Sequence, residues 1–148
     1  MNTVITGRIH KMAVVNELIR VEADGSISFG NYELGTKTKV SDFEYEGNLY
    51  KVKTFKEITK LERNDMFVYE SVPGTAVTNF TTTDNGVSFM VAGVGDAQVT
   101  VELEADAEYA IWKNGELVDC QKTNLGGKLS LSMDLTEDKA VRVSISKK

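Results

Sequence analysis

The sequence predicts an all-β protein, with an N-terminal antiparallel β-meander or small barrel followed by a β-sandwich. Apolar and polar residues alternate along most of the chain, which is the period of a strand that buries one face. Turn signals such as Asp-Gly and Asn-Gly interrupt this alternation at short and fairly regular intervals, as they do in sandwiches and barrels.

Two hairpins are expected in the first half. Residues 19–29 alternate on both sides of an Asp-Gly pair, and residues 42–52 do so on both sides of a Glu-Gly-Asn turn. Because glycine adopts the positive φ that tight turns need, both segments are predicted to fold as antiparallel strand pairs.

Residues 54–62 are ambiguous, since their apolar positions fit a helical face as well as a strand. The turn-like run at residues 63–65 that follows them favours a strand. A short helix stays open as the alternative, either here or over residues 12–19.

The only proline, Pro73, stands directly before Gly74, and such a pair strongly punctuates structure. We therefore expect a domain boundary at this point, with a β-rich N-terminal domain over residues 1–74 and an immunoglobulin-like β-sandwich over residues 75–148. A single core with a turn at Pro73 is the alternative.

The second half has the clearest strand pattern. Asn114-Gly115 is the strongest hairpin signal in the chain, because both residues tolerate the positive φ of a type I′ turn. Alternation is almost perfect over residues 129–135 and 141–145. About seven short strands between turn signals are typical of an immunoglobulin-like or fibronectin-like sandwich.

Composition excludes several classes of protein. Of the 148 residues, 41% are hydrophobic and 26% are charged, a balance that supports a folded core. The formal net charge is −5, and the 17 basic residues form no stripe that could displace counterions from phosphates. We therefore expect no nucleic-acid partner.

The lone cysteine and the N-terminal residues indicate the compartment. Cys120 has no second cysteine to pair with, which favours a reducing environment. Charged residues interrupt the first 15 positions, and no run approaches the 18 or so apolar residues of a membrane helix. We expect a cytoplasmic protein without membrane insertion, and an extracellular or cell-surface location reached by another route stays open.

The residues for common catalytic centres are scarce. His10 is the only histidine, which excludes multi-histidine metal sites. Cys120 lies in an alternating strand, where a small buried thiol is commoner than a nucleophile. We therefore predict no catalytic residue, no cofactor and no metal, and a non-catalytic role is favoured over an enzymatic one.

Carboxylates occur at alternate positions in two segments. We expect each set to form a solvated sheet face, and a calcium site or an acid/base pair is the alternative. The sets are Asp42, Glu44 and Glu46, and Glu102, Glu104, Asp106 and Glu108.

Three aromatic residues are the candidates for ligand binding. In the predicted strands that contain Tyr45, Tyr50 and Trp112, other positions already supply apolar residues that would point to the opposite face and form a core. Their rings could therefore face solvent, where aromatic side chains hold sugars or flat partners.

Two segments carry resemblances. Residues 124–133, leading to the final strand at 141–145, look like the immunoglobulin-like modules appended to bacterial surface proteins and carbohydrate-active enzymes. The whole chain, especially residues 12–29 and 72–80, is similar to small uncharacterised proteins of anaerobic Gram-positive bacteria that are sometimes labelled endosialidase-like. Both resemblances imply a small accessory module.

These observations leave three functional hypotheses. The first is a non-catalytic interaction or assembly module that binds a protein partner or itself through a sheet face or strand edge. The alternative is a carbohydrate-binding accessory module that uses exposed aromatic residues. The third and weakest is a glycan hydrolase that uses carboxylates such as Glu102 and Glu104.

Overall fold

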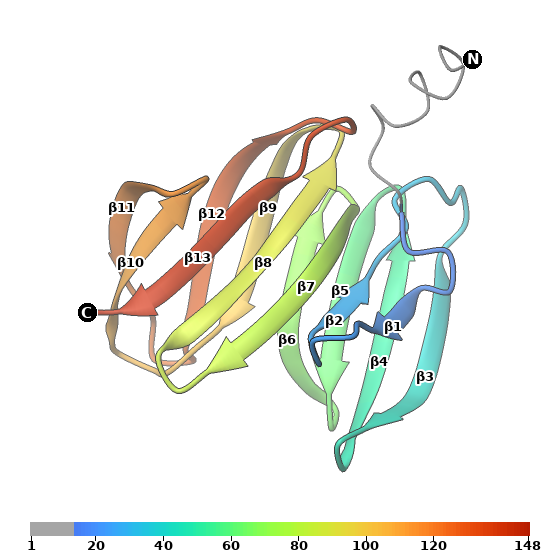
Figure 1. Ribbon diagram of the computed structural model, residues 1–148, viewed down its shortest axis with the longest axis horizontal. Coiled ribbons are helices and arrows are strands. Elements are labelled where there is room, and N and C mark those ends of the chain that lie inside the picture. The colour runs from blue at the N-terminus through green and yellow to red at the C-terminus, as the bar shows by residue number, and fades with distance from the viewer. Residues whose placement is uncertain (1–13) are drawn as a thin grey trace.

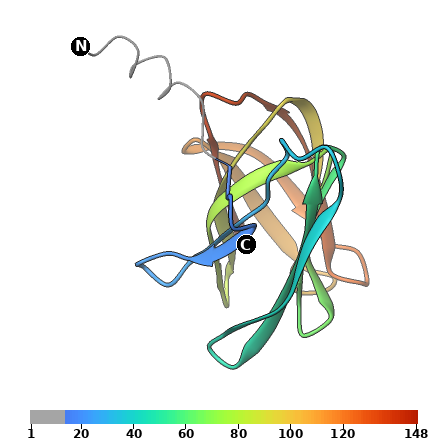
Figure 2. The same ribbon diagram turned by 90° about the vertical axis from the view of Figure 1, so that its right-hand side faces the viewer.

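The chain forms two antiparallel sheets packed face to face, as seen in Figure 1 and, turned by 90°, in Figure 2. The computed structural model describes residues 14–148, and these contain no helix. The predicted all-β sandwich is thus confirmed. The only histidine, His10, lies outside the described residues. No helix within residues 14–148 is long and apolar enough to cross a membrane.

The strands divide unequally between the sheets. The seven-stranded sheet has the spatial order β1 (Ile19–Val21), β2 (Ile27–Phe29), β7 (Thr75–Thr83), β8 (Gly86–Gly93), β13 (Val141–Lys147), β10 (Glu108–Lys113) and β11 (Glu116–Lys122). The six-stranded sheet has the order β12 (Lys128–Leu135), β9 (Gly95–Glu102), β6 (Met66–Val72), β5 (Ile58–Arg63), β4 (Asn48–Phe55) and β3 (Thr38–Tyr45).

The tight turns lie where the turn residues predict them. Asn114 and Gly115 have φ values of 51° and 85° and join β10 to β11. The turn between β3 and β4 has the same form, with φ values of 51° at Glu46 and 80° at Gly47. The strands on either side of Asp24-Gly25 also pair as expected.

The ambiguous segment is a strand. β4 ends at Phe55, β5 begins at Ile58, and the two pair antiparallel, so the interpretation of residues 54–62 as strand is confirmed. The described part of the alternative helix at 12–19 is irregular from residue 14 until β1 begins. Strands β3 to β6 follow one another across the sheet as the predicted meander.

The main hydrophobic core lies between the sheets, and Val14, Tyr32 and Ala76 form a second, small cluster. The centre of the main core is a cluster of aromatic rings from both sheets: Phe29, Phe80 and Phe89 from one, and Tyr69 from the other. Neighbouring ring centroids are 5.2–6.2 Å apart, mostly in edge-to-face contacts. Such pairs add to the free energy of burial because ring edges and faces carry opposite partial charge.

Pro73 and Gly74, where the sequence predicts a domain boundary, connect β6 in one sheet to β7 in the other. Strands from both sides of this connection meet in both sheets, since β2 pairs with β7 and β6 pairs with β9. Residues from both sides also belong to the same buried cluster. A side chain at Gly74 would collide with the backbone carbonyl of Phe55, which explains the glycine.

A buried hydroxyl network holds this crossing in place. Thr75 Oγ1 lies 2.9 Å from the hydroxyl of Tyr69 and 2.8 Å from Oγ of Ser71. Thr59 Oγ1 donates to the carbonyl of Thr75 at 2.9 Å and lies 2.8 Å from Thr54 Oγ1. Because these polar groups are buried, their mutual hydrogen bonds offset the cost of removing them from water.

Candidate functional site

Strand β11 forms the outer edge of the seven-stranded sheet and pairs with β10 alone. Six of its seven residues are exposed. Side chains of a strand normally alternate between a buried and an exposed face, so the facing sheet does not cover β11. Its two large apolar residues, Leu117 and Val118, are 54% and 49% exposed.

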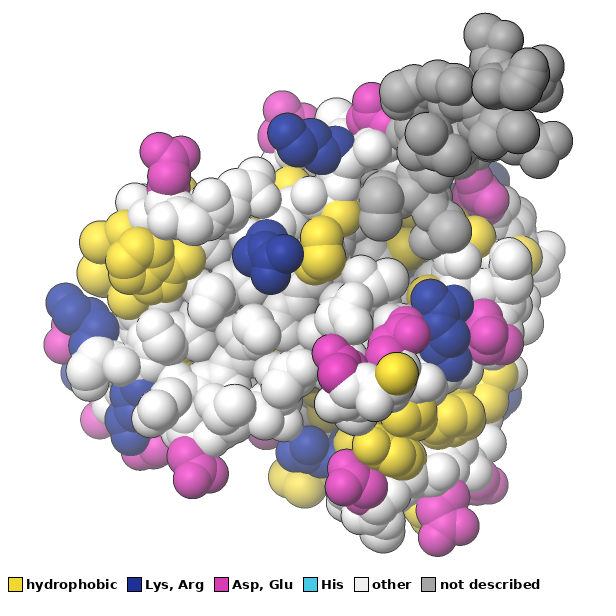
Figure 3. All heavy atoms as spheres, viewed as in Figure 1, with side chains coloured by type: hydrophobic (Ala, Val, Ile, Leu, Met, Phe, Trp, Pro, Cys, Tyr) yellow, Lys and Arg dark blue, Asp and Glu magenta, His cyan; other side chains and the backbone are white. Residues whose placement is uncertain are grey.

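Trp112 on β10 completes an apolar cluster at this edge. It lies opposite Leu117 in the strand register and is 37% exposed. The register shifts between Ile111 and Trp112, which leaves Val118 as the extra residue of a β-bulge. We call Trp112, Leu117 and Val118 the β10–β11 apolar surface. Figure 3 shows hydrophobic side chains gathered over this end of the sheet.

The backbone of the edge strand is partly covered. The N–H of Cys120 donates to Oδ1 of Asp119 at 2.8 Å, and Gln121 Nε2 donates to Oδ2 at 3.2 Å. A carboxylate on a backbone donor hinders the addition of another strand. Contacts at this edge are therefore expected to use side chains rather than the main chain.

The thiol of Cys120 is exposed, so the expectation of a buried cysteine is wrong. Residues 116–122 form a strand, but six of its seven residues are exposed, so the described elements cover neither of its faces.

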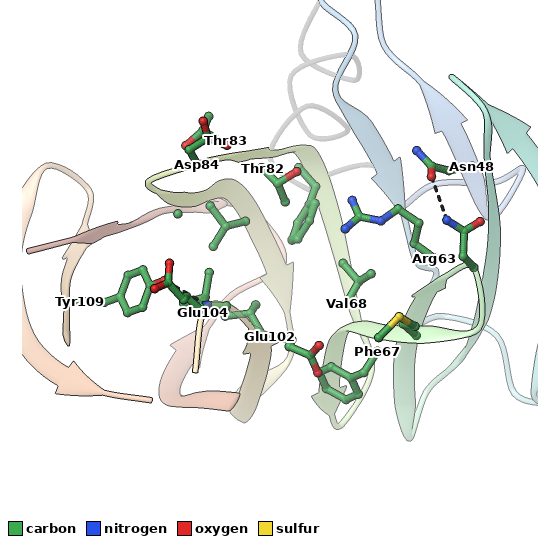
Figure 4. A pocket seen from close by; sticks show the side chains of 17 residues that line it. Asn48, Arg63, Phe67, Val68, Thr82, Thr83, Asp84, Glu102, Glu104 and Tyr109 are labelled. Atoms are coloured by element: carbon green, nitrogen blue, oxygen red, sulfur yellow. Dashed lines mark hydrogen bonds between the residues drawn. The ribbon is translucent and has the colours of Figure 1, made fainter. Parts of the chain in front are cut away.

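A cleft opens between the two sheets at the end where the β5–β6 and β7–β8 hairpins separate (Figure 4). Its volume is about 690 Å³. Buried core residues, among them Val68, Val87 and Val101, form its floor. Polar and charged side chains surround the opening, and we call this hollow the inter-sheet cleft.

Two predicted carboxylates line the cleft, and each has a lysine partner. Glu102 Oε1 lies 2.9 Å from Nζ of Lys128, and Glu104 Oε2 lies 2.7 Å from Nζ of Lys147. Lys128 belongs to β12, the strand next to β9, and Lys147 is the last residue of β13. Within residues 14–148, no group of three or more histidine, cysteine or acidic residues could hold a metal ion.

The other predicted carboxylates do not form rows on one sheet face. Asp42 lies in a β-bulge of β3 with a φ of 57°, and Glu46 is in the following turn. Asp106 also has a positive φ, lies between strands, and forms an ion pair of 3.2 Å with Lys122. Bulges and turns break the period of two, so the prediction of two continuous rows is wrong.

Arg63 is the residue of the cleft that sequence reasoning missed. Its side chain points from β5 into the cleft, toward Thr82 on β7 (Figure 4). It is half-buried and makes no hydrogen bond or ion pair with the described part of the chain. Its position directly before the Asn64-Asp65 turn was visible in the sequence, but the hairpin of the other sheet across the cleft was not.

Two asparagines form a rigid rim beside Arg63. Asn64 Nδ2 donates to Oδ1 of Asn48 at 2.8 Å, while Asn64 Oδ1 accepts a hydrogen bond of 2.9 Å from the N–H of Leu49. These bonds orient the Asn48 amide, whose nitrogen makes no hydrogen bond to residues 14–148.

The three predicted ligand-binding aromatics lie in two places. Tyr45 and Tyr50 are on the adjacent strands β3 and β4 and line a hollow of about 150 Å³. This hollow lies next to the cleft, because Arg63, Val68, Phe80 and Thr82 line both. Tyr50 is only 8% exposed, and Tyr45 is half-buried.

Trp112 belongs to the other sheet and to the β10–β11 apolar surface. The structure therefore brings Tyr45 and Tyr50 together and leaves Trp112 apart from them.

No protein-family model, curated protein or solved structure matches this chain. We therefore infer its function from the geometry of the β10–β11 apolar surface and the inter-sheet cleft.

Proposed function

We propose that this protein is a non-catalytic interaction module that binds a protein partner, or a second copy of itself, through the β10–β11 apolar surface. The observation that carries this proposal is the exposure of Leu117 and Val118 on an edge strand that no other element of the described residues 14–148 covers. Burying these side chains against a partner is favourable in proportion to the apolar area removed from water.

The composition of the surface fits a contact site. Trp112 supplies a large ring of the kind that most often dominates binding energy, and the apolar residues beside it exclude water. Glu116, Asp119 and Lys122 on the same strand are exposed and form a charged rim. An apolar centre with a polar rim is the usual anatomy of a protein interface.

The neighbouring sheet face extends the surface. Ser144 on β13 lies opposite Trp112, and Ser88 on β8 lies opposite Ser144. Small uncharged side chains allow a partner to approach closely without desolvating a charge. This matters because a stable interface needs about 800 Å² on each partner, more than three side chains provide.

The proposal is tested by size-exclusion chromatography with light scattering over a concentration series, together with pull-downs that use the protein as bait. The double variant Trp112→Ser/Leu117→Ser should lose self-association or the captured partner. The control Val94→Ser/Leu125→Ser removes two apolar residues outside the surface that are even more exposed than Trp112 and Leu117, and it should retain binding.

A monomer at every concentration that also captures no partner would contradict the proposal. Capture of the same partner by the wild type and by Trp112→Ser/Leu117→Ser would contradict the assignment of the surface.

Carbohydrate binding is a second candidate, supported by the half-buried ring of Tyr45, which lines a hollow next to the cleft together with the buried Tyr50. Aromatic rings beside polar groups suit the mixed apolar and polar faces of a sugar. A glycan array should give a signal with the wild type that Tyr45→Ala removes and Trp112→Ala retains. Absence of any signal would reject this candidate.

A further inference from the structure

The inter-sheet cleft has the dimensions and lining of a small-molecule site. Its volume of about 690 Å³ falls within the range of roughly 300–1,000 Å³ typical of ligand pockets. Apolar residues form its floor, and the polar and charged side chains around the opening can orient a ligand.

Arg63 forms no ion pair within the described residues 14–148. By contrast, Arg20 on β1 is held by Glu22 at 2.9 Å and by Glu17 at 3.3 Å. Arg63 has no such partner among residues 14–148, although the chain contains 22 acidic and 17 basic residues. The two glutamates that line the cleft are already paired with lysines.

The donors beside Arg63 are arranged for an anion. A guanidinium presents N–H groups in a planar fork that matches the two oxygens of a carboxylate or a phosphate. The amide nitrogen of Asn48 adds further N–H donors at the same rim, and its orientation is set by the bond to Asn64. Preorganised donors bind more tightly because little freedom is lost on binding.

The opposite wall of the cleft favours hydroxyl groups on the ligand. Thr82, Thr83 and Asp84 line the wall formed by the end of β7 and its turn (Figure 4). The exposed carboxylate of Asp84 can accept a hydrogen bond from a hydroxyl, but it would repel a second anionic group.

We propose that the inter-sheet cleft binds a small hydroxylated anion, whose carboxylate or phosphate is held by Arg63 and Asn48. This site is independent of the β10–β11 apolar surface, so a molecule bound in the cleft leaves that surface free.

The test is a titration of the ¹⁵N-labelled protein followed by amide chemical shifts. The probes are glucuronate, glucose 6-phosphate and uncharged glucose, each at up to about 10 mM, where even weak specific binding is detected. Glucuronate or glucose 6-phosphate should shift the amides of Asn48, Asn64 and Thr82, and glucose should not. A response to one anion alone identifies the carboxylate or the phosphate as the preferred group.

Variants of Arg63 connect the response to the cleft. Arg63→Gln should weaken binding of the responding anion by about tenfold or more, because a charged bidentate contact is lost. Arg142→Gln, which removes an exposed arginine on the outer face of β13, should leave affinity unchanged. Arg63→Lys keeps the charge without the fork and should give an intermediate affinity, which provides a second test if Arg63→Gln does not fold.

Three results would overturn the proposal: equal shifts with glucose, no shifts with either anion, or full binding by Arg63→Gln or Arg63→Lys.

Discussion

Strands β8 and β11 belong to the same sheet and have similar lengths, yet their surroundings differ completely. β8 lies between two neighbouring strands and buries six of its eight residues, whereas β11 has one neighbour and exposes six of its seven. Both strands contain large apolar residues, but Phe89 on β8 is buried in the core and Leu117 on β11 is exposed. What lies opposite a strand, rather than its own pattern, decides whether its apolar residues stabilise the fold or remain free for contact.

The largest effect on stability should come from the aromatic centre. In Phe89→Ala, the ring that lies 5.7 Å from Tyr69 and 5.5 Å from Phe80 is replaced by a cavity. We expect the free energy of unfolding to fall by about 3–5 kcal/mol, measured by urea denaturation. Trp112→Ala is the matched aromatic control and should lower it by less than about 1 kcal/mol. Similar losses in both variants would remove the contrast between the two strands.

An intermediate effect is expected from the hydroxyl network at the sheet crossing. Thr75→Val keeps the shape of the side chain but removes the hydroxyl shared by Tyr69 and Ser71. Leaving buried polar groups unpaired should lower the free energy of unfolding by about 1–3 kcal/mol.

The control for Thr75→Val is Thr100→Val, which breaks the exposed hydrogen bond of 2.8 Å to Ser130. This change should stay within about 0.5 kcal/mol of the wild type, as surface substitutions usually do. An unchanged unfolding midpoint for Thr75→Val would show that the network does not hold the crossing.

A smaller effect on the free energy of unfolding should follow a fall in pH, through Glu22 directly after β1. A hydrogen bond from Ser28 and a second, of 2.9 Å, from Arg20 lower the pKa of Glu22 below its ordinary value of 4.5. The stabilisation is present above pH 4.5 and is lost as the pH falls through the lowered folded-state pKa. Glu22→Gln should therefore reduce the acid-induced loss of stability by less than about 1 kcal/mol, measured by urea denaturation across this range. An identical pH dependence in wild type and variant would contradict this assignment.

The smallest effect on stability is expected at the β10–β11 apolar surface itself. Trp112→Ser/Leu117→Ser removes side chains that already contact water, so the thermal midpoint should change by only a few degrees at most. Association should be lost even though folding is retained. A large decrease in the thermal midpoint would mean that these residues support the fold.

The sequence predicted local structure well because the signals for it are local. Asn114-Gly115 and Glu46-Gly47 adopt the positive φ values that select tight turns, and residues 129–135 alternate as expected. The buried positions of β12 follow from that alternation, since Leu129 and Leu131 face the core.

Long-range arrangement was harder to predict. The pairing of β8 with β13 and of β6 with β9 joins segments that no turn signal connects. For the same reason the exposure of Cys120 and the placement of Arg63 in a cleft between two hairpins could not be derived from their neighbours in the chain.

The most direct test of the β10–β11 apolar surface uses Cys120 as a natural probe, because this exposed thiol lies on β11 beside Val118. The rate of its reaction with a maleimide should be measured for the isolated monomer and for the self-associated or partner-bound protein. We expect the bound form to react markedly more slowly, since the partner covers β11. Equal rates in the two forms would contradict the proposal that this strand is the contact surface.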